Sequence, residues 1–123
     1  MSDITKIVDT YLEAFNELDA AKRKALVERA WASDGSFTDP MFEVRGHAAL
    51  FDLAPAIAAK YPGHRFRRVS GVDSHHNVVR FGWEFAAGDG KVLVAGLDIG
   101  ELAGDGRLQC ITGFFGPLPD AGH

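Results

Sequence analysis

The second half of the chain consists of four long apolar segments separated by short polar turns. The segments span residues 65–73, 77–87, 91–103 and 106–116. The sequences between them are DSHHN, AAGDGK and AGDGR, which are rich in residues that favour tight turns. Strands that follow one another through tight turns pair in antiparallel order, so this pattern predicts an antiparallel meander.

These predicted strands are long and contain glycine in their interiors. A typical strand has about 5–6 residues, and all four segments are longer than that. Glycine weakens a strand unless a bend or a close approach requires it. The interior glycines are Gly71, Gly82, Gly96, Gly100 and Gly113. We therefore expect a strongly curved sheet that leaves a hollow on its concave side.

The first half of the chain is predicted to be helical. Within 3–18, apolar residues recur at three- and four-residue steps, which is typical of an amphipathic helix. A second helix is predicted over 20–32, with Trp31 pointing inward and Arg23 facing water. A third covers 46–60, although Pro55 removes a backbone donor within it. These helices are expected to pack into the concave face of the sheet.

Two short strands are predicted between the second and third helices, at 36–38 and 42–45. They follow Asp34-Gly35, which is predicted to interrupt the regular structure after the second helix. The predicted fold class is α+β: a cone-shaped, curved antiparallel sheet wrapped around N-terminal helices. Residues 1–116 are expected to form one domain, followed by a C-terminal tail at 117–123.

Composition narrows the classes of partner and location. A net charge of −4 disfavours binding to nucleic acid or to anionic membranes. Cys110 is the one cysteine, so no intrachain disulfide can form, and the first residues show no signal peptide. No apolar run is long enough to cross a membrane. We expect a cytoplasmic protein that uses no cofactor and no metal, since no Cys/His cluster is present.

The central predicted strands are apolar on both faces. Successive side chains of a strand point to opposite faces of the sheet. In VRFGWEFA (79–86) and VLVAGLDIG (92–100), apolar side chains fall on both faces. The helices can cover only one face of the sheet. We therefore expect a homodimer formed through the outer sheet face.

Three polar residues occupy positions where apolar residues are expected. Tyr11 lies within the apolar stripe of the first helix, and Asp98 interrupts an apolar strand on the same face as Gly96 and Gly100. Asp39 stands between Phe37 and Met41 and directly precedes Pro40. Burial would raise the pKa of an aspartate such as Asp98.

Each of these three residues could instead have a purely structural role. Tyr11 can be a core tyrosine, Asp39 can be a turn residue that faces water, and Asp98 can be satisfied by a neighbouring side chain. One shared cavity would explain all three positions.

At these residues the chain resembles the nuclear transport factor 2-like superfamily, which includes the SnoaL-like polyketide cyclases and the ketosteroid isomerases. The resemblance rests on Tyr11 and Asn16, on the step Thr38-Asp39-Pro40, and on the final strand pair GLDIGELAGDGRLQCITGFFG (96–116). It spans residues 4–116. It implies a cystatin-like or SnoaL-like architecture with a hydrophobic cavity.

The resemblance to ketosteroid isomerases also implies a role for each polar residue. Asp39 matches the position of the base, while Tyr11 and a protonated Asp98 match those of the oxyanion donors. Thr38 departs from the pattern, because isomerases often have an acidic residue there. Gly96 stands where the epoxide hydrolases of the superfamily have an arginine, which disfavours that activity.

The expected function is cofactor-independent proton transfer, an isomerisation, on a small apolar carbonyl compound. The predicted catalytic residues are Asp39, Tyr11 and Asp98. Aromatic residues expected to line the substrate pocket are Trp31, Phe37, Phe42, Phe51, Phe114 and Phe115. Two alternatives remain: a module that binds a hydrophobic ligand without turnover, and a SnoaL-like polyketide cyclase in which Asp98 is the acid/base.

Overall fold

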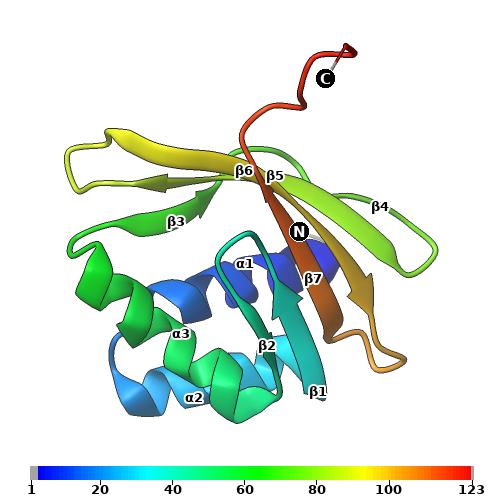
Figure 1. The fold of residues 1–123 in the computed structure, drawn as a ribbon. Helices are drawn as coiled ribbons and strands as arrows, with labels where there is room; N and C mark the ends of the chain where they lie inside the picture. The colour runs from blue at the N-terminus through cyan, green and yellow to red at the C-terminus, as the bar shows by residue number, and fades with distance from the viewer. Residues whose placement is uncertain (1–2, 123) are drawn as a thin grey trace.

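A computed structural model describes residues 3–122 of the chain. The helices are α1 (Asp3–Asn16), α2 (Ala20–Ala30) and α3 (His47–Lys60). The strands are β1 (Trp31–Thr38), β2 (Glu43–Arg45), β3 (Arg65–Arg68), β4 (Asp73–His75), β5 (Val78–Ala86), β6 (Val92–Leu102) and β7 (Leu108–Phe115). The predicted α+β class is confirmed, and the sheet curves around the helices (Figure 1).

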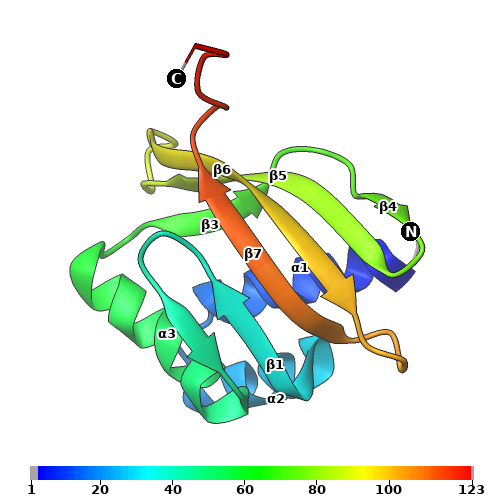
Figure 2. The same cartoon turned by 45° about the vertical axis from the view of Figure 1, so that its right-hand side comes forward.

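The sheet has the strand order β2-β1-β7-β6-β5-β3, with β4 pairing with the other half of β5. The pairs β3–β5, β5–β6 and β6–β7 are antiparallel, as the turn signals predict. The pair β1–β7 is parallel, so the sheet is mixed rather than purely antiparallel. In Figures 1 and 2 β1 lies beside β7. This pair joins the first and last strands of the chain.

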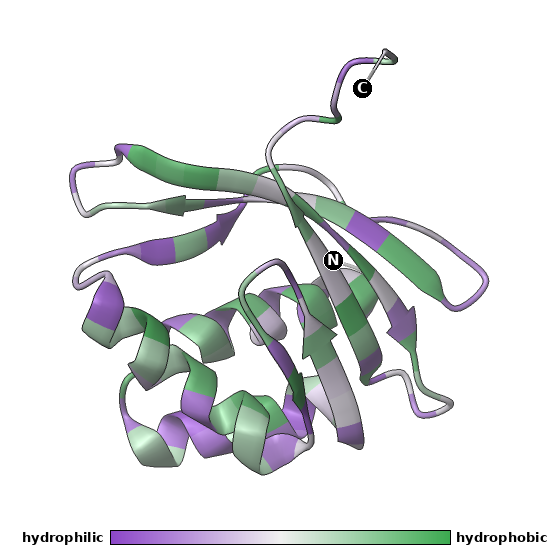
Figure 3. Cartoon of the chain, in the orientation of Figure 1, coloured by the Kyte–Doolittle hydropathy of each residue, from purple (hydrophilic) through white to green (hydrophobic). Residues whose placement is uncertain are grey.

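The core lies between the concave face of the sheet and the helices. Its members come from α1, α2, α3 and from alternate positions of β5, where Val79, Phe81, Trp83 and Phe85 are buried. The ribbons of the long strands β5 and β6 are hydrophobic over much of their length, whereas the short strand β3 is largely hydrophilic (Figure 3). The curvature keeps part of the sheet away from the helices, and the pocket described below lies there.

Two predictions at α2 are wrong. Trp31 does not end the helix but begins β1, because it takes extended backbone angles and pairs with Leu108 of β7. Asp34-Gly35 does not interrupt the regular structure, because β1 continues through these residues with an irregularity in register between Trp31 and Ser36.

Arg23 is buried rather than facing water. Its guanidinium donates to the carbonyl oxygens of Phe51 at 2.8 Å and Glu17 at 3.0 Å and stacks on the Phe51 ring at 4.0 Å. These contacts satisfy the buried cation without a carboxylate. Arg23 thereby links the end of α1 to α3.

The predicted strand 65–73 is two strands, β3 and β4, separated at Ser70. The Ser70 hydroxyl oxygen accepts a hydrogen bond from the Gly82 N–H at 2.7 Å. A side-chain acceptor therefore replaces a backbone carbonyl at this point of the β5 edge. The turn between β4 and β5 consists of His76 and Asn77, and His76 has a φ angle of 52°.

No helix within residues 3–122 is long and apolar enough to span a membrane. The cytoplasmic location expected from the sequence stays a prediction. After β7 the chain leaves the sheet and projects away from it (Figures 1 and 2).

Candidate functional site

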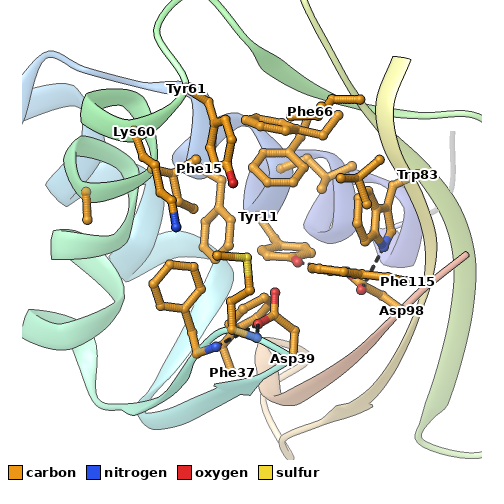
Figure 4. A pocket seen from close by; sticks show the side chains of 18 residues that line it. Tyr11, Phe15, Phe37, Asp39, Lys60, Tyr61, Phe66, Trp83, Asp98 and Phe115 are labelled. Carbon is orange, nitrogen blue, oxygen red and sulfur yellow. Dashed lines mark hydrogen bonds between the residues drawn. The ribbon is translucent and has the colours of Figure 1, made fainter.

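An apolar pocket lies between the concave face of the sheet, α1 and the end of α3. Its lining is mostly aromatic and aliphatic, and its polar members are Tyr11, Asp39, Lys60, Tyr61 and Asp98. Figure 4 shows the polar side chains around the hollow. All three predicted catalytic residues therefore lie on one pocket, although they are far apart in the chain.

The sheet register brings the two acids together around Gly113. Asp98 on β6 lies directly opposite Gly113 of β7. On the other side of β7, Thr38 pairs with Thr112, so the next residue, Asp39, also lies beside Gly113. A Cβ atom at Gly113 would lie 2.8 Å from Asp98 Oδ1 and 3.3 Å from Asp39 Cβ. Glycine at this position gives the two acids the space that they occupy.

Asp98 is buried with only 2% of its surface exposed. The Tyr11 hydroxyl donates to its Oδ2 at 2.7 Å, and the Trp83 indole N–H donates to its Oδ1 at 2.9 Å. Burial raises the pKa of Asp98 to about 7; the two hydrogen bonds oppose this rise, and the nearby Asp39 adds to it. Asp98 can therefore hold or release a proton near neutral pH.

Asp39 combines the turn role and the pocket position that the sequence left open. Its Oδ1 accepts hydrogen bonds from the backbone N–H groups of Met41 and Phe42, both at 2.8 Å, while its own N–H donates to the Phe42 carbonyl at 2.9 Å. These bonds hold the carboxylate in place beside the pocket. No described residue donates a side-chain hydrogen bond to Oδ2, so this oxygen can accept a proton from a ligand.

Tyr11 is held rigidly in the core end of the pocket. Its ring makes edge-to-face contacts with Phe15 and Trp31, at centroid distances of 5.0 and 5.4 Å. Burial and the adjacent Asp98 raise the pKa of the phenol well above its usual value. Tyr11 therefore keeps its proton and acts as a hydrogen-bond donor.

Three of the six predicted aromatic residues line the pocket: Phe37, Phe42 and Phe115. Trp31 is fully buried in the core, where its ring contacts that of Tyr11, and it does not line the pocket. Phe51 lies under the Arg23 guanidinium in a separate groove. Phe114 alternates to the outer face of β7 and is 55% exposed.

Asn16 has a structural part in the site. Its side-chain amide donates to the Phe66 carbonyl and its side-chain oxygen accepts from the Phe66 N–H, both at 2.8 Å. These bonds mimic those of a neighbouring strand and fix β3 to the end of α1. Phe66 is thereby held in the pocket wall.

Within residues 3–122, no three His, Cys, Asp or Glu side chains lie together as they would to hold a metal ion.

Comparison with solved structures identifies a related protein over the whole fold. A structure from Agrobacterium tumefaciens, described as a "putative isomerase of the SnoaL-like family", is 33% identical to this chain, with a TM-score of 0.87. The alignment covers 95% of this chain and 100% of the other. The chain belongs to the SnoaL-like family. The resemblance drawn from Tyr11, Asp39 and the final strand pair is thus confirmed at the level of family.

More distant structures share the SnoaL-like fold. A "putative polyketide cyclase" from Sinorhizobium meliloti is 15% identical, with a TM-score of 0.67 over 88% of this chain and 93% of its own. A protein from Methylobium petroleophilum with a cystatin-like fold is 19% identical, with a TM-score of 0.73 over 98% of this chain and 80% of its own. No protein-family model and no curated protein matches the chain.

Sequence reasoning missed three residues of this SnoaL-like site. Trp83 donates to Asp98 from the neighbouring strand, and Lys60 and Tyr61 line the α3 side of the pocket. A signal for Trp83 exists: it pairs with Gly96, where a Cβ would lie 2.4 Å from the indole ring. A glycine opposite a large aromatic residue indicates that the aromatic side chain crosses over it.

Proposed function

We propose that this SnoaL-like protein catalyses cofactor-independent proton transfer on a small apolar carbonyl compound, an isomerisation. The observation that carries the proposal is the meeting of Tyr11, Asp39 and Asp98 on one apolar pocket, with Tyr11 donating to Asp98 at 2.7 Å. Proton transfer between carbons next to a carbonyl needs a base near the carbon and donors at the oxygen. The three side chains supply these groups.

Asp39 acts as the base in this proposal. Its free Oδ2 removes a proton from the carbon next to the carbonyl and returns it at a second carbon, while the electron pair moves to the carbonyl oxygen and back. Its Oδ1 remains bound to two backbone N–H groups throughout. The carboxylate is therefore oriented before the ligand arrives, which lowers the entropy lost in the reaction.

Tyr11 and protonated Asp98 stabilise the oxyanion. With Asp98 protonated, the pair carries two hydroxyl protons and uses one of them for the bond between the two residues. The other is available to a ligand oxygen. In a site with an apolar wall such a donor contributes several kcal/mol, on the order of 3.

An enone assay tests this function. Wild type is expected to convert a β,γ-unsaturated cyclic ketone to its conjugated isomer, followed by the absorbance of the conjugated enone. Binding of an apolar phenol without any conversion would contradict catalysis and support the alternative of a binding module. Failure of both binding and conversion would contradict the pocket's role altogether.

The cyclase alternative has its own supporting observation, since Asp98 has a pKa near 7 and can act as acid and base. Comparison of Asp39→Asn with Asp98→Asn separates the two reactions. Loss of turnover in Asp39→Asn favours isomerisation, in which Asp39 is the base. Full activity in Asp39→Asn together with its loss in Asp98→Asn favours ring closure.

We also propose that two copies pair through the outer sheet face. A row of exposed apolar residues crosses the sheet there: Leu97 pairs with Phe114, Ile99 follows on the same face, and Val69 lies against Gly82. An apolar row of this kind is typical of an interface.

Leu97→Glu is expected to convert a dimer into a monomer of 13.3 kDa in sedimentation experiments. The charge would be buried against the partner, while in the monomer it faces water. Leu118→Glu, at a tail residue that is 92% exposed, is the control and should leave the mass unchanged. A wild type that sediments as a monomer at all concentrations would contradict the dimer.

A further inference from the structure

Two polar side chains on the pocket have no part in the proposed chemistry. Lys60 and Tyr61 stand at the end of α3 and line the same hollow as Asp39 and Asp98. In Figure 4 the Lys60 ammonium and the Tyr61 hydroxyl are directed into the hollow from the α3 side. Tyr11 and Asp98 approach it from the opposite side. The pocket therefore has two polar ends separated by apolar side chains.

The groups at the α3 end are unpaired. Among residues 3–122, neither the Lys60 ammonium nor the Tyr61 hydroxyl has a hydrogen bond or ion pair, whereas Arg67, Arg68 and Arg80 each pair with a carboxylate. The nearest aromatic contact of Lys60 is the Tyr61 ring, at 5.7 Å from its centroid. Both groups are free to bind a ligand.

The charges on the pocket differ between its two ends. Lys60 is the one basic residue among the described residues of the lining, and both acids, Asp39 and Asp98, lie toward the sheet. A lysine in the last turn of a helix also interacts favourably with the free carbonyl groups there. That interaction explains a cation at the end of α3 but supplies no anionic partner for it.

We propose that the ligand is an apolar carbonyl compound that also carries a carboxylate, which Lys60 binds with help from the Tyr61 hydroxyl. This rests on the proposed function, because it takes the carbonyl end to lie at Tyr11 and Asp98. A carboxylate at that end would be repelled by Asp39 and would have to share a buried site with Asp98. At the α3 end it meets the ammonium of Lys60, which is exposed and lines the pocket, and can form a charge-assisted hydrogen bond with it.

Equilibrium binding of two matched ligands tests this inference. 2-Naphthol and 6-hydroxy-2-naphthoate share the ring system and the hydroxyl group, but only the second carries a carboxylate. Wild type is expected to bind the naphthoate about tenfold more tightly than naphthol, equivalent to about 1.4 kcal/mol. The preference should disappear in Lys60→Met and shrink with added salt. Calorimetry or ligand fluorescence measures both affinities.

Lys6→Met is the matched control, since Lys6 is exposed on α1 and lies off the pocket. It makes the same change in net charge and should keep the tenfold preference. Naphthol binding with no preference for the naphthoate, or a preference that survives in Lys60→Met, would overturn the inference and leave the proposed function standing. Absence of binding by both ligands would overturn the two together.

Discussion

Replacing Asp39 by asparagine is expected to lower kcat for enone isomerisation by about 10²–10⁴-fold, the usual contribution of a general base. The amide oxygen can accept the same two N–H groups, those of Met41 and Phe42, that now bind Oδ1 at 2.8 Å. The amide nitrogen takes the place of Oδ2 and cannot accept a proton. Ligand affinity and thermal stability should therefore stay close to wild type, while steady-state kinetics show the loss.

Asp34→Asn is the control for Asp39→Asn. Asp34 lies on β1, the strand that ends just before Asp39; it is exposed and accepts a hydrogen bond from Gln109 at 3.0 Å that an amide oxygen can also accept. It makes the same change in charge and should keep the wild-type rate. A wild-type rate in Asp39→Asn would exclude Asp39 as the base.

The stability of the wild type is expected to fall with rising pH between about 4 and 7, relative to Asp98→Asn. The folded protein holds the Asp98 proton up to a pKa of about 7, whereas the unfolded chain loses it near the ordinary value of 3.8. The stabilisation is fully present below the unfolded pKa and is lost as the pH rises through the folded one. At 1.36 kcal/mol for each pKa unit, the full change is about 4 kcal/mol.

Urea unfolding of both proteins across this pH range measures the difference, since other titrating groups are common to the two. Trp83→Phe gives an independent test. It removes the N–H that donates to Asp98 at 2.9 Å and favours the charged form. The pKa of Asp98 should then rise further, and the pH dependence should extend to higher pH. Parallel profiles for wild type and Asp98→Asn would contradict a raised pKa.

Much of the fold could be predicted because its signals are local. Apolar periodicity predicts α1, and compact turn sequences predict the order of β5, β6 and β7. The parallel pair β1–β7 could not be predicted in this way. It joins residues such as Trp31 and Leu108, and no turn between them records the pairing. The same pairing draws Trp31 out of the helix that its neighbours favour.

The residues of the candidate site differ in the same way: some have a local sequence signal, and others depend on long-range packing. Asp98 and Tyr11 stand out because a polar group interrupts an apolar pattern, which is visible in sequence. Phe114 and Phe115 cannot be assigned to a face without the register of β7, and only Phe115 faces the pocket. Lys60 resembles any basic residue at the end of a helix, so its position on the pocket depends on the packing of α3 against the sheet.

The place of β7 between β1 and β6 has a consequence for folding order. Asp39 and Asp98 are brought together through Gly113 of β7, the last strand of the sheet in chain order. A chain still emerging from the ribosome can form its helices and the β5–β6 hairpin, but it cannot yet assemble the pocket. Contacts this distant in sequence also slow folding. The site can therefore assemble only after β7 has been synthesised and has paired with β1 and β6.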